Sequence, residues 1–518
     1  MELRPSRLWP VVLVLGWLLD FLFWKKAPGI NFALYAALCL TAGVILLRVE
    51  GIHPARRSLW LLLPTAFFAV LTFLRAEPLT LVLAYLLTLF LLGLFVVTFH
   101  GGRWLEYGLL DYAVRYAKLV GSMIARGGMF LSATRKPTQE QPKRLLHKVG
   151  PILRGTLIAA PSVLVFAVLL SSADPIFAQR LRDWTAFLRL ERLPEYLLRG
   201  GYIVVTAYLL AGIVLHAGTR GREERLIGEG NAVIRPFLGF LEAAIALVSV
   251  ELLFASFVVV QFQYFFGGRE NIRLGGFTYA EYARRGFGEL VVVAFFSLLF
   301  LQALSLFARR EAASQRRAFS GLAVALVGLV LVILASAYRR LLLYEAAYGF
   351  SRLRTYTHVF MVWLGLLLVA VMVLAMVRRE RAFALAALLM AFGFAGTLGM
   401  MNVDRFIARA NIRRALAGQE LDIGYLATLS DDAVPVLASA FRSPALPAEI
   451  RESVGAALAC RLSLRGDPTR PRPWPSFHFS HWNADRLLAE LKPELQEYRK
   501  EGGSWLIAPG GKRYPCAW

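Results

Sequence analysis

Residues 278–289, TYAEYARRGFGE, lead directly into residues 290–308, LVVVAFFSLLFLQALSLFA. A transmembrane helix needs about 17–25 predominantly apolar residues, and the second stretch meets this requirement without a charged residue. Tyrosines and arginines immediately before such a run are typical of the boundary between lipid and water. The two stretches together predict a membrane-spanning helix with an interfacial segment at its start.

Apolar runs of the same kind recur along the chain. Of the 518 residues, 57% are hydrophobic and 18% are charged, which is too apolar for a soluble protein of this length. We therefore predict an all-α, polytopic helical membrane bundle of about eleven transmembrane helices. These are expected at residues 8–24, 30–47, 59–74, 79–99, 155–172, 202–217, 237–266, 290–308, 318–337, 356–377 and 382–401.

The composition changes after residue 401. We predict a transmembrane domain over residues 1–401 and a small, mostly helical, soluble C-terminal region over residues 402–518. Amphipathic patterns predict helices within residues 421–441, 447–463 and 483–501, the last of them capped by Asn483. A proline-rich linker, RGDPTRPRPWPSF, separates the last two helices.

Residues 109–128 carry a separate helical signal. One face of this predicted helix is apolar, and the opposite face carries polar residues, namely Asp111, Arg115, Lys118, Ser122 and Arg126. The pattern favours an amphipathic helix on the membrane surface, with basic residues toward anionic lipid. A connecting helix packed on other helices remains an equal alternative.

The net charge of +23 is spread over the loops between the predicted spans. No basic domain could follow a nucleic-acid backbone, so we expect the lipid bilayer and not nucleic acid as the partner of these charges. Lys and Arg are more frequent in loops that would be cytoplasmic if the N-terminus is inside. Eleven crossings then place the C-terminal region outside the cytoplasm, where Cys460 and Cys516 could form a disulfide.

Several boundary segments predicted on the extracytoplasmic side share arginine, tyrosine and glutamate. The candidate ligand-binding residues in them are Arg284, Arg285, Glu281, Tyr282, Arg339, Arg340, Glu345, Arg352 and Arg354. Guanidinium groups suit phosphate or carboxylate, so the set predicts a vestibule for an anionic lipid head group or small anionic ligand. The structural alternative is a set of interfacial anchors and ion pairs. Glu251, midway along a predicted span, is a further candidate for a functional polar site.

The sequence contains no Walker loop, dinucleotide fingerprint, serine-centred elbow or metal-ligand spacing. We therefore predict no cofactor and no metal, assign no catalytic residue, and favour a protein that is not an enzyme. The leading hypothesis is an envelope or transporter-like membrane protein that binds an anionic ligand. Two alternatives remain open: a membrane enzyme acting on a lipid-linked substrate, and an envelope scaffold or sensor whose C-terminal region binds a partner.

Four motifs occur in order: SADPIF at 172–177, TYAEYARRGFGEL at 278–290, RLLLYEAAYGFSRLR at 340–354, and FIARANIRRALAGQELDIGYLATLSDDAVPVL at 406–437. In these motifs the chain resembles the bacterial multi-pass membrane proteins of domain of unknown function 4153/4173. The resemblance runs from the fifth predicted span into the C-terminal region. It implies a location in the bacterial inner (cytoplasmic) membrane, and it carries no established reaction and no catalytic residue.

The predicted orientation can be tested with reporter fusions. Alkaline phosphatase, which is active only outside the cytoplasm, is expected to be inactive when fused at Thr138 and active when fused after Trp518. Green fluorescent protein at the same two positions is the control and should give the reverse pattern. Fluorescence from the fusion after Trp518 would contradict the predicted orientation.

Overall fold

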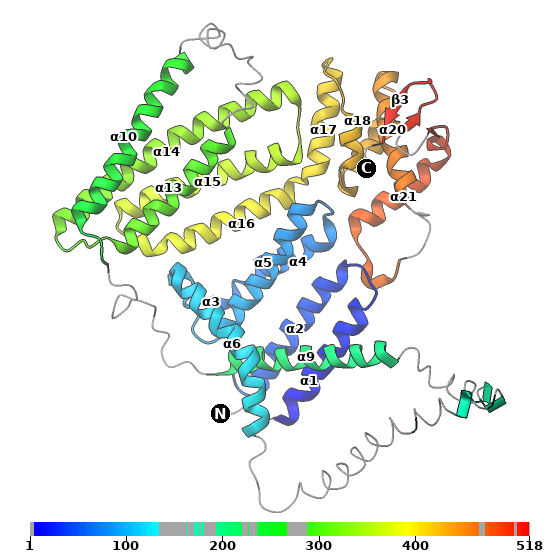
Figure 1. Cartoon of the computed structure of the whole chain (residues 1–518), viewed down its shortest axis with the longest axis horizontal. Helices are drawn as coiled ribbons and strands as arrows, with labels where there is room; N and C mark the ends of the chain where they lie inside the picture. The colour runs from blue at the N-terminus through cyan, green and yellow to red at the C-terminus, as the bar shows by residue number, and fades with distance from the viewer. Residues whose placement is uncertain are drawn as a thin grey trace, which may run out of the picture. The chain divides into compact units, whose positions relative to one another are not determined.

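A computed structural model of the chain, drawn in Figure 1, describes residues 5–133, 193–219, 236–266, 287–465, 472–501 and 505–516, with a few isolated positions between them. Most of the described residues are helical.

Ten membrane-length apolar helical segments occur among the described residues, which confirms the predicted polytopic bundle. Each coincides with a predicted span, whereas the span predicted at 155–172 lies almost wholly outside the described residues. The ten segments are built from α1 (Pro5–Phe23), α2 (Ile30–Val49), α3 (Arg56–Leu59) with α4 (Leu62–Leu74), α5 (Pro78–Val97), α9 (Leu193–Gly218), α10 (Phe240–Phe266), α13 (Phe287–Phe307), α14 (Ala313–Tyr348), α15 (Arg352–Met376), and η3 (Glu380–Ala382) with α16 (Phe383–Met401).

The chain divides into two compact units. Unit 1 comprises residues 1–24, 41–52 and 118–219, and its main contact joins α1 to α9. Gly16 permits this approach, because a Cβ atom there would lie 2.6 Å from the carbonyl oxygen of Ile203. Asp20 is buried in the same contact and accepts hydrogen bonds from Arg199 Nε at 2.9 Å and from the Tyr202 hydroxyl. An acidic group inside a membrane helix needs such partners from the protein.

Unit 2 comprises residues 25–40, 53–117 and 220–518. In it α14 packs against α10, α13 and α15, while α16 packs against α15, α4 and α5 (Figure 1). Gly393 and Gly399 allow α16 to approach its neighbours, because a Cβ atom would lie 2.1 Å from the Trp363 ring and 2.4 Å from the Leu71 side chain, respectively. The outward faces of these helices expose large apolar side chains, as expected for surfaces in contact with lipid.

Helix α6 (Leu109–Ala133) covers the predicted amphipathic segment. Its apolar face is exposed, with Val120 and Ile124 more than half accessible. Of its polar residues, Ser122 is buried and shares a 2.8 Å hydrogen bond with His216 Nδ1 within unit 1, whereas Lys118 is exposed. The exposed apolar face fits contact with lipid, while a position on the membrane surface stays a prediction.

The C-terminal region begins at a sharp turn. Asn402 adopts a left-handed conformation with φ of 55°, ends α16, and caps α17 (Val403–Leu416) by accepting a hydrogen bond from the backbone N–H of Arg405. The next elements are α18 (Ile423–Thr428), η4 (Asp431–Ala433), α19 (Val434–Phe441), α20 (Ala448–Leu464), η5 (Trp474–Ser476) and α21 (Phe479–Leu495).

Two predicted features of the C-terminal region differ from the structure. Helix α21 begins at Phe479 and not behind Asn483, because its buried face, which includes Leu488 and Leu491, extends back to Ser480. The chain after α21 forms a three-stranded antiparallel sheet of β1 (Arg499–Glu501), β2 (Trp505–Ile507) and β3 (Arg513–Pro515) in the order β1-β2-β3. Three-residue strands are too short to show an alternating pattern in the sequence.

One hydrophobic core joins the C-terminal region to the membrane helices. Val359 of α15 and Leu398 of α16 belong to the same buried cluster as Ile407, Leu437 and Leu488. Within this core Cys460 and Cys516 form a disulfide, with Cα atoms 5.7 Å apart. The disulfide ties α20 to the chain segment after β3.

Removing the disulfide is expected to destabilise the C-terminal region. The two cysteines are 56 residues apart, and opening a loop of this size costs about 2–4 kcal/mol. Cys516→Ser should therefore lower the free energy of unfolding by this amount, measured by denaturant titration of the purified protein with tryptophan fluorescence. Wild-type protein treated with a reducing agent is the control and should show the same loss. Equal denaturation midpoints for the oxidised wild type and the variant would contradict the prediction.

Candidate functional site

Charged residues of unit 2 gather at both ends of its helices. We call the end at which α4 and α14 finish and α5 and α15 start the docked side, because the C-terminal region packs there. The opposite side is the end at which α13 and α15 finish and α14 and α16 start. The loops at 75–77 and 349–351, both predicted to be extracytoplasmic, lie on the docked side.

On the docked side, Arg352 of α15 and Asp404 of α17 form a two-point ion pair. Nε of Arg352 donates to Oδ1 at 2.8 Å, and Nη2 donates to Oδ2 at 2.6 Å. The Asp404 side chain is fully buried and also accepts a hydrogen bond from the backbone N–H of Ser430. The planar groups match in this geometry, so the pair fixes the start of α15 against α17.

The loop between α4 and α5 is held by two further buried carboxylates. Glu77 accepts hydrogen bonds from two backbone N–H groups of α5, each at 2.8 Å, and from the hydroxyl of Tyr356. Asp432 accepts a hydrogen bond from the backbone N–H of Ala76 at 2.7 Å. Burial raises the pKa of Asp432 above its ordinary value, although the Ala76 hydrogen bond acts in the opposite direction. Both sides of the loop are therefore fixed to neighbouring elements.

Asp431 has its partners within the C-terminal region. Nη2 of Arg461 lies 3.0 Å from Oδ1, and Oδ2 contacts both Arg465 and Nδ1 of His481. Burial lowers the pKa of Arg461 to about 10, so its guanidinium stays charged at neutral pH. The two adjacent aspartates thus have different roles. Asp431 pairs with arginine and histidine side chains inside the C-terminal region, and Asp432 accepts a hydrogen bond from the loop between α4 and α5.

Two predicted site residues of α14 are buried with separate partners. Arg340 donates from Nη2 to Oε1 of Gln261 at 2.8 Å. A carboxylate oxygen of Glu345 lies 3.4 Å from Nδ1 of His358, whose Nε2 shares a 2.6 Å hydrogen bond with the hydroxyl of Tyr338. These contacts link α14 to α10 and α15.

Arg354 and Arg414 together cap the C-terminal end of α14. Nη1 of Arg354 donates to the carbonyl oxygen of Gly349 at 2.6 Å, and Nη2 of Arg414 donates to that of Ala346 at 2.9 Å. The last carbonyl groups of a helix lack partners within the helix and form the negative end of its dipole. Both arginines therefore stabilise the end of this long helix.

The contacts above do not account for the remaining predicted site residues. Arg339 is exposed on α14, and the segment that contains Glu281, Tyr282, Arg284 and Arg285 lies outside the described residues. Glu251 is half-buried on α10, and its Oε1 atom has no hydrogen-bond partner among the described residues. Arg340, Glu345, Arg352 and Arg354 each have different partners within the protein, and ligand binding by the set stays a prediction.

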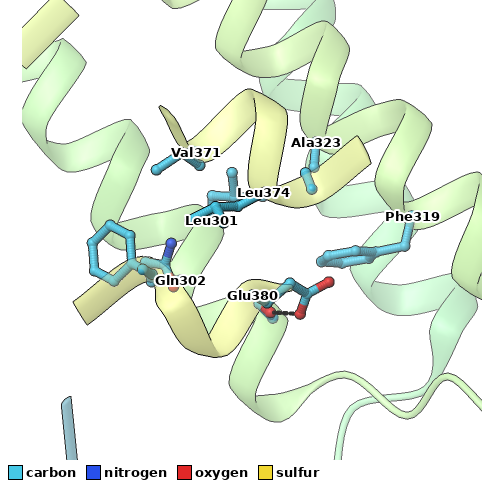
Figure 2. Close-up of a pocket in the computed structure, with 10 residues that line it drawn as sticks. Leu301, Gln302, Phe319, Ala323, Val371, Leu374 and Glu380 are labelled. Carbon is cyan, nitrogen blue, oxygen red and sulfur yellow. Dashed lines mark hydrogen bonds between the residues drawn. The ribbon is translucent and has the colours of Figure 1, made fainter. Parts of the chain in front are cut away.

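On the opposite side, Glu380 closes the small cavity drawn in Figure 2. Arg310 donates to its two oxygens at 2.7 and 3.0 Å, and the Ser305 hydroxyl donates at 2.5 Å. Apolar side chains, including Phe319 and Leu374, line the rest of this cavity. Its volume of about 20 Å³ leaves room for about one water molecule.

A larger cavity of about 830 Å³ shares Glu380 with the first. Arginine is the most frequent residue in its lining, contributed by Arg310, Arg316, Arg378, Arg379 and Arg381. The volume lies within the range of about 300–1,000 Å³ that small-molecule sites occupy. The sequence analysis did not predict this cavity, because its arginines come from two separate turns. By itself, a basic loop predicts only that the loop lies on the inner membrane surface.

The buried carboxylates were also missed as site residues, although signals for two of them exist. Glu77 directly precedes Pro78, a combination typical of a helix N-terminus. Asp432 follows Asp431 in an otherwise apolar stretch. Among the residues described, no group of three or more His, Cys, Asp or Glu side chains is placed to hold a metal ion.

The fold and its ion pairs define a polytopic α-helical membrane protein whose C-terminal region is fixed to the ends of its helices. Residues 62–440 match the model of the domain of unknown function DUF4153, so the chain belongs to this family. The matched range contains Glu77, Arg352, Asp404 and Asp432. No curated protein and no solved structure is detectably similar to the chain.

Asp404→Asn is expected to destabilise the C-terminal region strongly. The substitution leaves the partly buried guanidinium of Arg352 without its countercharge, and breaking a buried pair in this way costs about 3–5 kcal/mol. The measurement is denaturant unfolding of the purified protein.

Glu490→Gln is the matched control, because it removes the exposed 3.3 Å pair with Arg442. Such a surface pair contributes about 0–1 kcal/mol. Similar losses of unfolding free energy in Asp404→Asn and Glu490→Gln would show that the Arg352 pair does not hold the C-terminal region.

Proposed function

We propose that this DUF4153 protein binds an anionic ligand with phosphate head-group chemistry at its extracytoplasmic face, as a non-enzymatic part of the bacterial envelope. One observation carries the proposal. Arg405, Arg409 and Arg413 are all exposed at one-turn intervals along α17, over about 12 Å. They have no carboxylate partner among the described residues, unlike Arg352, which pairs with Asp404.

The surroundings of this stripe suit a membrane boundary. Helix α17 follows α16 after the single turn residue Asn402, and Phe406 and Leu416 are exposed on it beside the arginines. Its opposite face, which includes Ile407, is buried in the shared core. A helix that presents arginines and large apolar side chains together is typical of the lipid head-group layer.

The C-terminal region offers aromatic side chains to the same layer. Trp474, Phe479 and Trp482 are exposed, and this segment joins the start of α2 through a 2.8 Å hydrogen bond from the Ile30 N–H to the Phe477 carbonyl. Aromatic residues of this kind are enriched where lipid meets water. These features support a C-terminal region that rests on the bilayer.

The disulfide supports the extracytoplasmic orientation. Cys460 and Cys516 are paired, and disulfides persist in oxidising compartments but are rare in the cytosol. The orientation predicted from the loop charges agrees with this pairing.

The binding function is favoured over the two alternatives. An enzyme acting on a lipid-linked substrate would need a carboxylate open to that substrate beside an arginine. On the docked side Glu77, Asp404 and Asp432 are buried and hydrogen-bonded within the protein. A scaffold would need no exposed cationic stripe.

The test compares purified full-length protein in nanodiscs of phosphatidylcholine with and without phosphatidylglycerol. Each arginine near an anionic surface contributes about 1 kcal/mol to attraction. Phosphatidylglycerol is expected to raise the Tm of the wild type and slow hydrogen exchange in α17. The triple variant Arg405→Gln, Arg409→Gln, Arg413→Gln should lose most of the slowing in α17.

The matched control is Lys492→Gln, Arg499→Gln, Lys500→Gln, which removes the same charge from exposed positions of the C-terminal region away from α17. It should retain the slower exchange in α17. If the control loses the effect equally, or if the wild type shows none, the α17 stripe is not the binding surface.

A further inference from the structure

We propose a second binding site, for a phosphate-bearing anion, in the arginine-lined cavity on the opposite side of unit 2. The cavity lies at helix ends other than those that carry α17, so the inference is independent of the proposed function.

Two turns build the cationic wall of this cavity. Arg378 adopts a left-handed conformation with φ of 56°, and the backbone N–H of Arg379 donates to the Leu374 carbonyl at 2.9 Å, which ends α15 in a tight turn. The 3-10 helix η3 follows at once and adds Arg381 to the lining. Arg310 lies in the turn between α13 and α14, and Arg316 lies in the first turn of α14. Side chains distant in sequence therefore line the same cavity.

The two acidic residues that line the cavity already form ion pairs with arginine side chains. Glu380 is paired with Arg310 through both oxygens. Glu106 is paired with Arg103 at 2.7 Å and with Arg57 at 3.3 Å, and neither of these partners lines the cavity. The negative charges of Glu380 and Glu106 are therefore already paired, and they do not offset the charges of Arg316, Arg378 and Arg379.

Arg316, Arg378 and Arg379 have no carboxylate partner among the residues that the structure describes. Arg378 and Arg379 are exposed. Nη1 of Arg316 donates to the carbonyl oxygens of Arg310 and Glu311, at 3.1 and 2.8 Å, which orients its guanidinium without neutralising it. Like charges gathered around one cavity repel each other, and an anion in that cavity relieves the repulsion.

The chemistry of the lining selects phosphate. Guanidinium groups donate pairs of parallel hydrogen bonds to phosphate oxygens, and several arginines suit a ligand with more than one negative charge. Apolar lining residues such as Leu105, Leu226 and Ala308 exclude water from part of the cavity and so strengthen these interactions. Arginines that only retain loops in the cytoplasm need not line a common cavity.

The phosphate can come from a phospholipid head group or from a soluble phosphorylated compound. Pyrophosphate is the soluble probe, titrated calorimetrically into full-length protein in phosphatidylcholine nanodiscs. Phosphatidylglycerol in the nanodisc is the lipid probe, with Tm as the readout. The lipid arm uses the Arg405→Gln, Arg409→Gln, Arg413→Gln background, so that α17 does not contribute.

The cavity variant is Arg378→Gln, Arg379→Gln, chosen because neither side chain forms an ion pair with a described residue. We expect it to weaken pyrophosphate binding about tenfold or more if the ligand is soluble. If the ligand is a lipid head group, pyrophosphate is inert and the variant instead loses the gain in Tm from phosphatidylglycerol. Either result supports the site and identifies the source of the phosphate.

The control variant is Arg48→Gln, Arg56→Gln. Both arginines are exposed and predicted on the same side of the membrane, and neither lines the cavity. It removes the same charge and should bind like the wild type. The proposal is overturned if neither probe affects the protein, or if the cavity and control variants respond equally.

Discussion

A buried charged group at the end of a membrane helix must receive its partners from the protein, because hydrocarbon supplies no hydrogen bonds and burial removes water. On the docked side two buried carboxylates meet this constraint with donors from a different element. Asp404 of α17 pairs with Arg352 of α15, and Asp432 accepts from the loop before α5. Removing the C-terminal region would leave Arg352 and that loop without these partners, so its position and that of the helix ends depend on each other.

The two sides of unit 2 use arginine differently. On the docked side, Arg340, Arg352 and Arg354 have partners within the protein, namely an amide, a carboxylate and the carbonyl groups of a helix end. On the opposite side, Arg378 and Arg379 line a cavity whose carboxylates are already paired. The same residue type therefore stabilises the fold on one side, and on the other side includes Arg378 and Arg379, which have no carboxylate partner among the described residues. This difference separates structural arginines from candidate ligand-binding arginines.

The exposed stripe of α17 is the proposed binding surface of the docked side, on the same helix that anchors the C-terminal region. One face of this helix contributes Asp404 and Ile407 to the interior, and the other exposes Arg405, Arg409 and Arg413. The buried pair with Arg352 fixes the rotation of α17 about its own axis. Exposure of the arginines is therefore a consequence of how Asp404 is satisfied.

The sequence by itself determined the helical membrane class and the positions of the ten described spans, because hydrocarbon selects long apolar runs independently of tertiary contacts. It also indicated the change of composition at residue 401, whereas it left open whether Cys460 and Cys516 pair, which the structure shows. Only the tertiary structure decided which arginines have partners within the protein. Arg352 pairs with Asp404, which is 52 positions away in the sequence. Arg310 and Arg379, which are further apart still, line the same cavity. Hydropathy and local spacing carry no information about such contacts, since these depend on how the helices pack.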